Sequence, residues 1–536
     1  MTIRLAVDVG GTHTDAVILD FTRGRGSLLG SVKVPTSPDV ETGIVQSMEA
    51  VLEASTISSE QINYVMIGTT QSRNAILQRK GLARIGLIRI GSPSVSEIEP
   101  FFTWAEDLRE AIGNNWFLVD GGYEFDGRPI SQINEEQVRK VLLEIKRQRL
   151  EAIAVCGVFS PVCAQQELEI GRLAEEVLGR DFPITLSHQV GSIGLLEREN
   201  SAALNAALAM VAKNIAEGLE KALRLRNIKA PTYFSQNDGT LMSIEYAKKY
   251  SILTICSGPS NSIRGAAFLS GLKDCIVIDV GGTSTDIGIL QNGYPRESYM
   301  SVVLGEVETN FRMPDLISLG LGGGSIVKLG HGELEIGPES VGYNIITQGK
   351  TWGGDTLTLT DAAIAANILD MNKIHPGGRP VPVQEGVIRQ VFAKVNSIIE
   401  GAIDKIKTSH DPLPVILVGG GSLMVNSTLK GASEVIRPKN YEFANAIGAA
   451  IAKVGGEVDK IWSLRSKTRE QVMREAKGQA IAEAVRAGAD SRTVEILDVE
   501  EFPVAYLPVD AVRLKIKAAG ELPSEGSPEL ASRQYV

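Results

Sequence analysis

Hydrophobic residues in this chain gather in short continuous runs, and few stretches alternate strictly between apolar and polar positions. The first two runs cover residues 3–9 and 14–20 and are rich in valine and isoleucine. Continuous β-branched runs are typical of strands in a sheet that is covered on both faces. The pattern therefore predicts an N-terminal hairpin inside an α/β layer.

Helical spacing follows this hairpin. Apolar residues recur every three or four positions in 40–54, 135–149 and 165–178, which predicts three amphipathic helices. Short apolar runs at 152–159 and 183–187 alternate with these helices. Such alternation of strand and helix indicates a layer with parallel strand pairs.

Later segments extend the prediction. Residues 199–225 are rich in alanine and predict one long helix that bridges two halves of the molecule. We expect a short strand at 253–256 and, after residue 466, a helix and two strands that form a small added layer. The tail after Gly520 has no apolar periodicity, and we expect it to be loose.

Residues 275–286, CIVIDVGGTSTD, nearly repeat residues 5–15, LAVDVGGTHTD. In each copy an apolar strand ends in aspartate, a Gly-Gly-Thr turn follows, and Thr-Asp opens a second strand. The two copies are too far apart for a tandem array. Their spacing suits two halves of one molecule that face a shared cleft.

The chemistry of these turns favours a phosphate clamp. Paired glycines let backbone amides approach an anion without a Cβ in the way, and threonine hydroxyls donate to phosphate oxygens. Asp8 and Asp279 can hold a hydrated Mg²⁺ or orient a water molecule. Two ordinary hairpins with glycine turns are the plain alternative, and the repetition of both turn and flanks argues against it.

Three other strand ends carry polar or glycine-rich segments. Residues 64–68 run into Thr69 and Thr70 before a predicted helix. There an N-terminal cap and an anion site explain the threonines equally well, and the same two explanations hold for Ser257-Gly258-Pro259. The segment VILVGGGSL at 415–423 places three glycines at a strand end, where a flat group such as adenine can lie against backbone.

Composition narrows the class of protein. The chain has 536 residues, a formal charge of −10 and 43% hydrophobic residues, as expected for a soluble protein of more than one domain. The negative charge argues against nucleic-acid binding, and no apolar run reaches membrane-spanning length. The N-terminus enters a strand at once, and four cysteines show no CxxC spacing, so we expect a cytoplasmic protein with reduced thiols.

Several common catalytic motifs do not occur. There is no GxxxxGK[ST], no GxGxxG, no HExxH and no GxSxG. The sequence therefore supports neither a P-loop, nor a Rossmann dinucleotide site, nor a zinc protease, nor an α/β-hydrolase. His13 is the one histidine inside a clamp turn.

The duplicated DxGGTxxD turns and the late glycine strand end are similar to the actin/Hsp70/sugar-kinase superfamily. Within it the sequence resembles the hydantoinase A/5-oxoprolinase family, with matching segments in the family's order over most of the chain. These segments are DVGGTHTD (8–15), IGTTQSRNAIL (67–77), AVCGVFS (154–160), SHQVGSIGLLERE (187–199), SGPSNSIRGA (257–266), DVGGTSTD (279–286), LGGGS (321–325), GPES (337–340) and TDA (360–362).

The resemblance implies an α/β fold with two actin-like, ribonuclease H-like lobes around a nucleotide cleft and a small C-terminal addition. We expect an N-terminal lobe at 1–195, a second ATPase-like lobe at 196–465 and the addition at 466–536. The resemblance makes Gly10–Thr12 and Gly281–Thr283 the phosphate loops and Gly419–Gly421 the adenosine loop.

The predicted site follows from the repeat and the resemblance together. Asp8, Asp279 and Asp286 are the candidate catalytic residues, and Asp8 and Asp279 are also the candidate Mg²⁺ ligands. The expected ATP-binding residues are Gly10, Gly11, Thr12, Thr14, Asp15, Gly281, Gly282, Thr283, Ser284, Gly419, Gly420 and Gly421. The expected substrate-binding residues are Thr69, Thr70, Ser257, Gly258 and Gly323.

The implied activity is ATP-dependent hydrolysis of a cyclic amide through phosphorylation of its oxygen. A second, B-type subunit or a homo-oligomer is the implied partner. A small-molecule kinase of the same superfamily and an ATP-switched regulatory protein are the alternatives. The sequence departs from the family at His13, where the family has an aromatic residue, and in the segment 342–355. The resemblance therefore supports the nucleotide site better than it supports the identity of the substrate.

Overall fold

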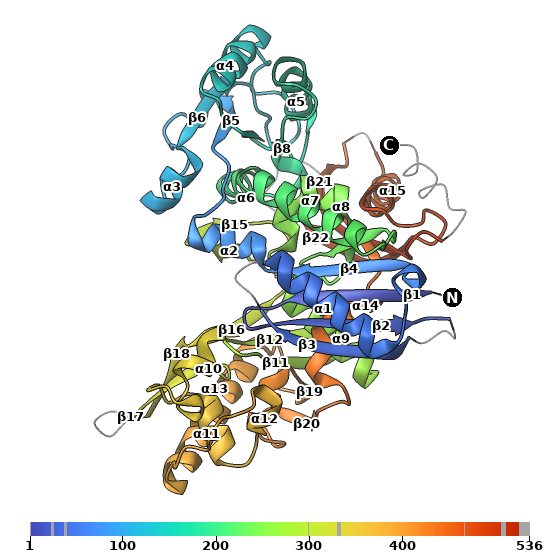
Figure 1. The fold of residues 1–536 in the computed structure, drawn as a ribbon. Helices are drawn as coiled ribbons and strands as arrows, with labels where there is room; N and C mark the ends of the chain where they lie inside the picture. Colours follow the sequence, from blue (N-terminus) through green and yellow to red (C-terminus); the bar gives the residue numbers. More distant parts are fainter. Residues whose placement is uncertain are drawn as a thin grey trace.

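Two sheets with the same strand order organise the computed structural model of this protein (Figure 1). The structure describes residues 2–22, 26–36, 40–298, 300–329, 334–465, 467–504 and 511–524. Most of the predicted loose tail therefore lies outside the described residues.

The first sheet begins with five strands in the order β3-β2-β1-β4-β9. Strand β1 pairs antiparallel with β2 and parallel with β4, and β4 pairs parallel with β9. The strands are β1 (Ile3–Val9), β2 (His13–Asp20), β3 (Ser27–Pro35), β4 (Tyr64–Thr69) and β9 (Thr232–Ser235).

The second sheet repeats this plan around β11. Strand β11 pairs antiparallel with β12 and parallel with β19, which pairs parallel with β20. The strands are β11 (Cys275–Val280), β12 (Thr285–Gln291), β13 (Tyr294–Pro295), β16 (Leu316–Leu319), β19 (Leu413–Val418) and β20 (Ala432–Ile436). Two lobes of equal topology confirm the predicted fold class.

The C-terminal part extends the first sheet. Strands β10 (Leu241–Ser243), β21 (Val454–Ser463), β23 (Ala511–Gly520) and β22 (Glu495–Pro503) continue it beyond β9, with α15 (Arg469–Ala487) packed on β21 and β23. Strands β9 and β10, within residues 232–243, thus belong to the same sheet as β1. The predicted domain boundaries stay a prediction, and the first sheet runs across them.

A third, four-stranded parallel sheet stands at one end of the molecule (Figure 1). Its order is β6-β5-β7-β8, with β5 (Ile85–Ser92), β6 (Asn115–Asp120), β7 (Ala152–Gly157) and β8 (Ile184–Leu186). Helices α4 (Glu135–Arg147) and α5 (Gln165–Leu178) accompany it. This sheet confirms the parallel α/β layer expected from the strand and helix alternation.

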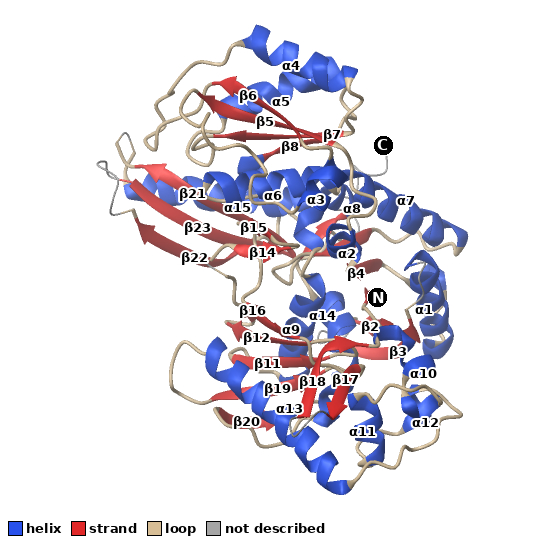
Figure 2. Ribbon diagram, turned by 90° about the vertical axis from the view of Figure 1, so that its left-hand side faces the viewer, coloured by secondary structure: helices blue, strands red, loops and turns tan. Residues whose placement is uncertain are grey.

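Two helices rich in small residues lie between the large sheets. Helix α9 (Ser257–Ser270) packs on β11 and β12, and α14 (Ala444–Ile451) packs on β1 and β2 (Figure 2). A Cβ built on Gly265 would lie 1.8 Å from the Ala444 carbonyl oxygen, and one on Gly448 would lie 1.8 Å from that of Asn261. Glycine at both positions permits this close crossing.

Two predicted elements differ in the structure. The single helix expected over 199–225 is two helices, α6 (Leu195–Ala207) and α7 (Ala209–Leu225), which meet at Leu208. The strand expected at 253–256 is instead a 3₁₀ helix, η3 (Ser251–Thr254), followed by α9. Short apolar runs fit a buried helical turn as well as a strand, so periodicity alone did not separate them.

The remaining described elements complete the lobes. Helix α1 (Val40–Ser55) covers β1–β3, α2 (Gln71–Gln78) follows β4, and α13 (Glu385–Ile406) covers the second sheet. The others are α3 (Glu106–Ile112), α8 (Ile244–Lys249), β14 (Val302–Leu304), β15 (Val307–Thr309), β17 (Ser325–Leu329), β18 (Leu334–Ser340), α10 (Ile345–Gln348), α11 (Leu359–Ala365) and α12 (Met371–Ile374). None of the described helices is both long and apolar enough to cross a membrane.

Candidate functional site

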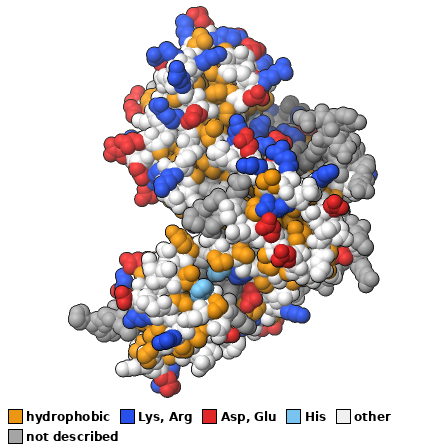
Figure 3. Space-filling model, in the orientation of Figure 1, with side chains coloured by type: hydrophobic (Ala, Val, Ile, Leu, Met, Phe, Trp, Pro, Cys, Tyr) orange, Lys and Arg blue, Asp and Glu red, His pale blue; other side chains and the backbone are white. Residues whose placement is uncertain are grey.

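The two glycine turns meet in space. A Cβ built on Gly282 would lie 2.6 Å from the Thr12 hydroxyl oxygen, and one on Gly11 would lie 4.0 Å from that of Thr283. The turns come from the β1–β2 and β11–β12 hairpins, one in each lobe. Segments at distant places in the sequence therefore form one site where the lobes face each other, and the molecular surface is hollowed between these parts (Figure 3).

Each turn is closed by its first glycine. The amide of Gly10 donates to the His13 carbonyl (3.0 Å), and that of Gly281 donates to the Ser284 carbonyl (2.9 Å). These two amides already donate within their own turns and are therefore not available to a ligand. Within the described residues, the amides of Gly11, Thr12, Gly282 and Thr283 donate to no backbone carbonyl, so they are the ones that an anion could take.

Asp8 lies at the end of β1 and is buried, with 4% of its surface exposed. Its carboxylate accepts hydrogen bonds from the side-chain amides of Asn261 and Asn445, both at 3.1 Å. Gly68 lies beside it on β4, where a Cβ would lie 1.9 Å from Asp8 Oδ1. Burial raises the pKa of Asp8 to about 6.

Asp279 occupies the same position at the end of β11. Ser262 Oγ donates to its carboxylate at 2.5 Å, and Asp279 is half-buried. Burial raises the pKa of Asp279 to about 6, and the negative charges of Asp286 and Asp8 add to this effect. The negative charge of Asp8 thus acts on Asp279 across the two lobes.

Each aspartate faces a second one across its hairpin, Asp15 opposite Asp8 and Asp286 opposite Asp279. Lys33 forms an ion pair with Asp15, and Asn445 donates to Asp15 at 2.9 Å. Asp286 accepts a hydrogen bond from Ser318, and burial raises its pKa. The first pair thus carries a cation, whereas the second is held by hydroxyl groups.

Helix α9 joins the two aspartates. Asn261 binds Asp8 and its neighbour Ser262 binds Asp279, so successive residues of one helix hold both carboxylates. The expected site residues included neither, although both lie in the SGPSNSIRGA segment. Asn445 on α14 was also missed, and no motif in the sequence marks it.

A glycine segment supports the second turn from behind. The Gly323 amide donates to the Gly281 carbonyl (3.1 Å), and the Gly324 amide donates to the Gly282 carbonyl (2.7 Å). The Gly323 carbonyl in turn accepts from the Thr360 hydroxyl at 2.8 Å. Gly323 was predicted to bind substrate, and the structure gives its backbone groups this supporting contact.

The three glycines after β19 are not equivalent. Gly419 has a φ of +81°, and a Cβ there would lie 2.2 Å from Asp279 Oδ1, whereas a Cβ on Gly421 would press on Val280. A Cβ on Gly420 would meet nothing within 4 Å. Only Gly420 therefore leaves open space beside the backbone for a flat group, and its adenosine role remains a prediction.

The candidate substrate residues divide between the two explanations that the sequence left open. Thr69 Oγ1 accepts from the Gln71 amide (3.2 Å) at the start of α2, whereas the Thr70 hydroxyl donates to the Val9 carbonyl (3.4 Å) at the end of β1. Ser257 is buried, and its hydroxyl has no partner among the described residues. Gly258 faces open space.

Three further predictions concern smaller details. Thr14 is buried, and its hydroxyl bonds to that of Thr36 at 3.3 Å. The His13 ring bonds to the Thr12 hydroxyl at 3.1 Å, and burial together with the Lys33 charge lowers its pKa to about 4, so it is neutral at pH 7. Segment 342–355 begins beside the supporting glycines, where the Val341 amide donates to the Gly324 carbonyl.

Metal binding by protein side chains alone is not supported within the described ranges, where no group of three histidine, cysteine or acidic residues could hold an ion. Asp8 and Asp279 offer two carboxylates beside free amides. This donor set fits Mg²⁺, which keeps several waters and takes its other ligands from phosphates.

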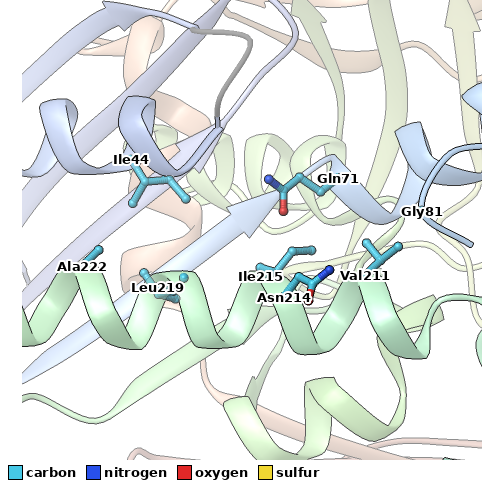
Figure 4. A pocket seen from close by; sticks show the side chains of 9 residues that line it. Ile44, Gln71, Gly81, Val211, Asn214, Ile215, Leu219 and Ala222 are labelled. Atoms are coloured by element: carbon cyan, nitrogen blue, oxygen red, sulfur yellow. The ribbon is translucent and has the colours of Figure 1, made fainter.

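A separate cavity of about 300 Å³ lies between α1, α2 and α7 (Figure 4). Aliphatic side chains line it, together with the carboxamides of Gln71 and Asn214 and no charged residue. Gln71 and Arg73 are two positions apart on α2, so they point to opposite sides of the helix. The cavity therefore lies on the side away from Arg73 and apart from the two turns.

Comparison with known families supports this picture. The profile of the hydantoinase/oxoprolinase N-terminal region matches residues 4–178, and that of hydantoinase/oxoprolinase matches residues 198–407. Both glycine turns fall inside these matches.

Individual relatives are moderately similar. The acetophenone carboxylase gamma subunit of Aromatoleum aromaticum is 28% identical over 72% of this chain and 56% of its own length. Caprolactamase subunit alpha of Pseudomonas jessenii is 26% identical over 81% of this chain and 67% of its own. The 5-oxoprolinase 1 of Arabidopsis thaliana is 24% identical over 85% of this chain and 38% of its own length. The chain therefore spans only part of the curated relatives that it matches.

Two solved structures share the fold. The ATP-dependent caprolactamase of Pseudomonas jessenii superposes with a TM-score of 0.78 at 19% identity, covering 98% of this chain and 89% of that one. Nucleotide-free acetone carboxylase gives a TM-score of 0.68 at 17% identity, covering 97% and 88%.

Proposed function

From the premise that the chain belongs to the hydantoinase/oxoprolinase family, we propose that it is the ATP-binding part of an ATP-dependent hydrolase. Its substrate is a cyclic amide such as a hydantoin, a lactam or 5-oxoproline. The relatives named caprolactamase and 5-oxoprolinase favour this chemistry over that of a sugar kinase.

One observation carries the proposal: two glycine turns, whose amides are free among the described residues, touch across the lobes, with the buried Asp8 beside one and the half-buried Asp279 beside the other. A chain of phosphates needs several donors from more than one direction, and the backbone of two facing turns supplies them. Asp8 would hold a Mg²⁺, which would shield the phosphate charge.

The chemistry explains why ATP is needed. An amide carbon is a poor electrophile, so its oxygen first attacks the γ-phosphorus of ATP, the bond to the bridging oxygen breaks, and ADP leaves. Water then adds to the activated carbon, and the C–N bond breaks as nitrogen takes a proton. A second water hydrolyses the resulting acyl phosphate to a carboxylate and phosphate.

The two aspartates suit different parts of this sequence. A carboxylate whose pKa lies near 6 accepts a proton more readily than an ordinary one and is still mostly ionised at pH 7. Asp279 has one hydroxyl donor and is half-buried, so we assign it the proton transfer. Asp8, held by two amides, is assigned to positioning of the phosphates through the metal.

A second subunit completes the proposed enzyme. Two relatives are named as subunits, and this chain covers only part of their length. We propose that a B-type subunit supplies the site for ring opening, while this chain carries out the phosphoryl transfer. A cytoplasmic location remains the expectation from the sequence.

The test is a phosphate balance with ATP and a panel of hydantoins, lactams and 5-oxoproline, with and without the product of an adjacent B-like gene. Ring opening with release of one phosphate per ATP supports the proposal. A stable phosphoester would instead indicate a kinase, and turnover that no ring compound stimulates would indicate a nucleotide switch.

A further inference from the structure

Arg73 of α2 is a cation that has no ion-pair partner among the described residues. It lies in the first turn of α2, directly after the β4 strand end, and it is half-buried. Among the described residues it makes no hydrogen bond and no ion pair, unlike Arg79 at the other end of the same helix, which pairs with Asp107. Its guanidinium can therefore donate to an anion that binds beside it.

The surroundings of Arg73 place it at the start of α9. Its neighbour Ser72 shares a hydrogen bond of 3.1 Å with Thr254, two residues before Cys256. Burial raises the pKa of Cys256 and of Asp286, and the positive charge of Arg73 opposes this effect at both groups. Arg73 therefore reaches the region where α9 begins and the second hairpin opens.

The first turn of α9 offers further donors at this place. Ser257 has 1% of its surface exposed, and its hydroxyl is unpartnered within the described residues. The next residue, Gly258, faces open space. The amides of a helix N-terminus attract negative charge, and α9 is long enough, at 14 residues, to have this effect.

Asp286 does not neutralise the arginine. No ion pair joins the two side chains, and the Asp286 carboxyl instead accepts a hydrogen bond from Ser318. The phosphates of a nucleotide already have the four free amides of the glycine turns. The Arg73 guanidinium beside the start of α9 is thus available for a second anion. Its planar, forked donors suit a planar group such as a carboxylate.

We propose that Arg73, Ser257 and the N-terminal amides of α9 form an anion subsite that binds a carboxylate carried by the cyclic amide substrate. This inference rests on the proposed function and narrows it to ring compounds with an acidic substituent. The arginine fork binds the carboxylate in a bidentate manner, and the ring is thereby held with its amide toward the two glycine turns.

The test compares two compounds that differ only in the carboxylate, 5-oxoproline and 2-pyrrolidinone. Each is titrated calorimetrically into the full chain with a non-hydrolysable ATP analogue. We expect the wild type to prefer 5-oxoproline by roughly 10- to 100-fold, as for a charge-assisted bidentate pair. Arg73→Met should abolish this preference and leave the affinity for 2-pyrrolidinone and for the nucleotide unchanged.

Two further variants sharpen the result. Arg73→Lys keeps the charge without the fork and should retain part of the preference, and Arg79→Met is the matched control that should retain all of it. Equal affinity of the wild type for both compounds, or no binding of 5-oxoproline, overturns the inference. A loss of nucleotide affinity in Arg73→Met also overturns it, because Arg73 would then serve ATP.

The inference and the proposed function fail in different ways. A chain that hydrolyses ATP with neutral lactams and ignores the carboxylate keeps the function and loses the inference. A chain that binds 5-oxoproline through Arg73 but never turns over ATP with it keeps the subsite and loses the function.

Discussion

The two glycine turns have nearly the same sequence, and yet their surroundings differ. Asp8 is buried and held by two amide donors, with a lysine on its partner Asp15. Asp279 is half-buried and held by one hydroxyl, and its partner Asp286 carries no ion pair in the part of the chain that the structure describes. A duplicated motif thus marks a shared ligand, while the neighbours from other elements decide which copy is fixed and which is free to react.

The largest expected effect is a difference in ATP turnover between variants of the two aspartates. Asp279→Ala should abolish ATP turnover, by at least about 10³-fold, because it removes the proposed proton acceptor. Asp8→Ala should cost less, on the order of 10- to 100-fold, because other metal ligands remain. Steady-state turnover of both purified variants decides this, with circular dichroism as the control for folding. Wild-type turnover in Asp279→Ala would refute its assignment.

The glycines provide the next contrast. Gly282→Val should block nucleotide binding, with a loss of at least about 100-fold in affinity, because its side chain would collide with Thr12. Gly401→Ala on α13, where a Cβ also meets nothing within 4 Å, is the matched control and should bind ATP normally. Calorimetry measures the ATP affinity of these variants. Unchanged affinity in Gly282→Val would contradict the proposal that the two glycine turns bind the phosphates. A loss in Gly420→Ala would indicate adenine beside this glycine.

The pH dependence of turnover tests the shared environment. Because the pKa values of Asp8 and Asp279 are both raised to about 6, turnover should fall as the pH drops through about 6, where both carboxylates become protonated. An ordinary aspartate would stay ionised to about pH 4. A rate profile that is flat down to pH 5 would show that neither group takes part.

The smallest effect concerns stability. A folded-state pKa raised above the unfolded value means that ionised Asp8 opposes folding at pH above about 6, by at most about 3 kcal/mol, and that this cost disappears as the pH falls toward 4. Asp8→Asn removes this cost and should therefore raise the free energy of unfolding at pH 7.5. The expected gain is only about 1–2 kcal/mol, because one amide donor then faces another. At pH 4 the gain should vanish.

Urea unfolding at both pH values measures this difference. Lys33→Met serves as the contrast, because it removes the cation near the first pair and should lower the stability at pH 7.5. A destabilised Asp8→Asn variant at pH 7.5 would mean that the amide contacts outweigh the cost of the buried charge.

Part of the local structure could be predicted from the sequence, and part could not. The strands around Asp8 and Asp279 follow from continuous valine and isoleucine runs, and the matched DVGGT segments predicted the turns that follow them. The break at Leu208 and the 3₁₀ helix at 251–254 were missed, because alanine-rich and short apolar segments fit more than one element equally well. Asn445 had no signal, since a single asparagine in a helix of small residues is ordinary.

By itself, the sequence determined that two hairpins carry glycine turns with aspartates at matching positions, because β-branched runs and Gly-Gly-Thr leave the backbone few alternatives. Only the tertiary structure decided that the turns touch, that α9 supplies a donor to each aspartate, and that Arg73 has no partner among the described residues. These facts depend on segments that lie hundreds of positions apart in the chain, and local residue preferences carry no information about distances across a folded interior.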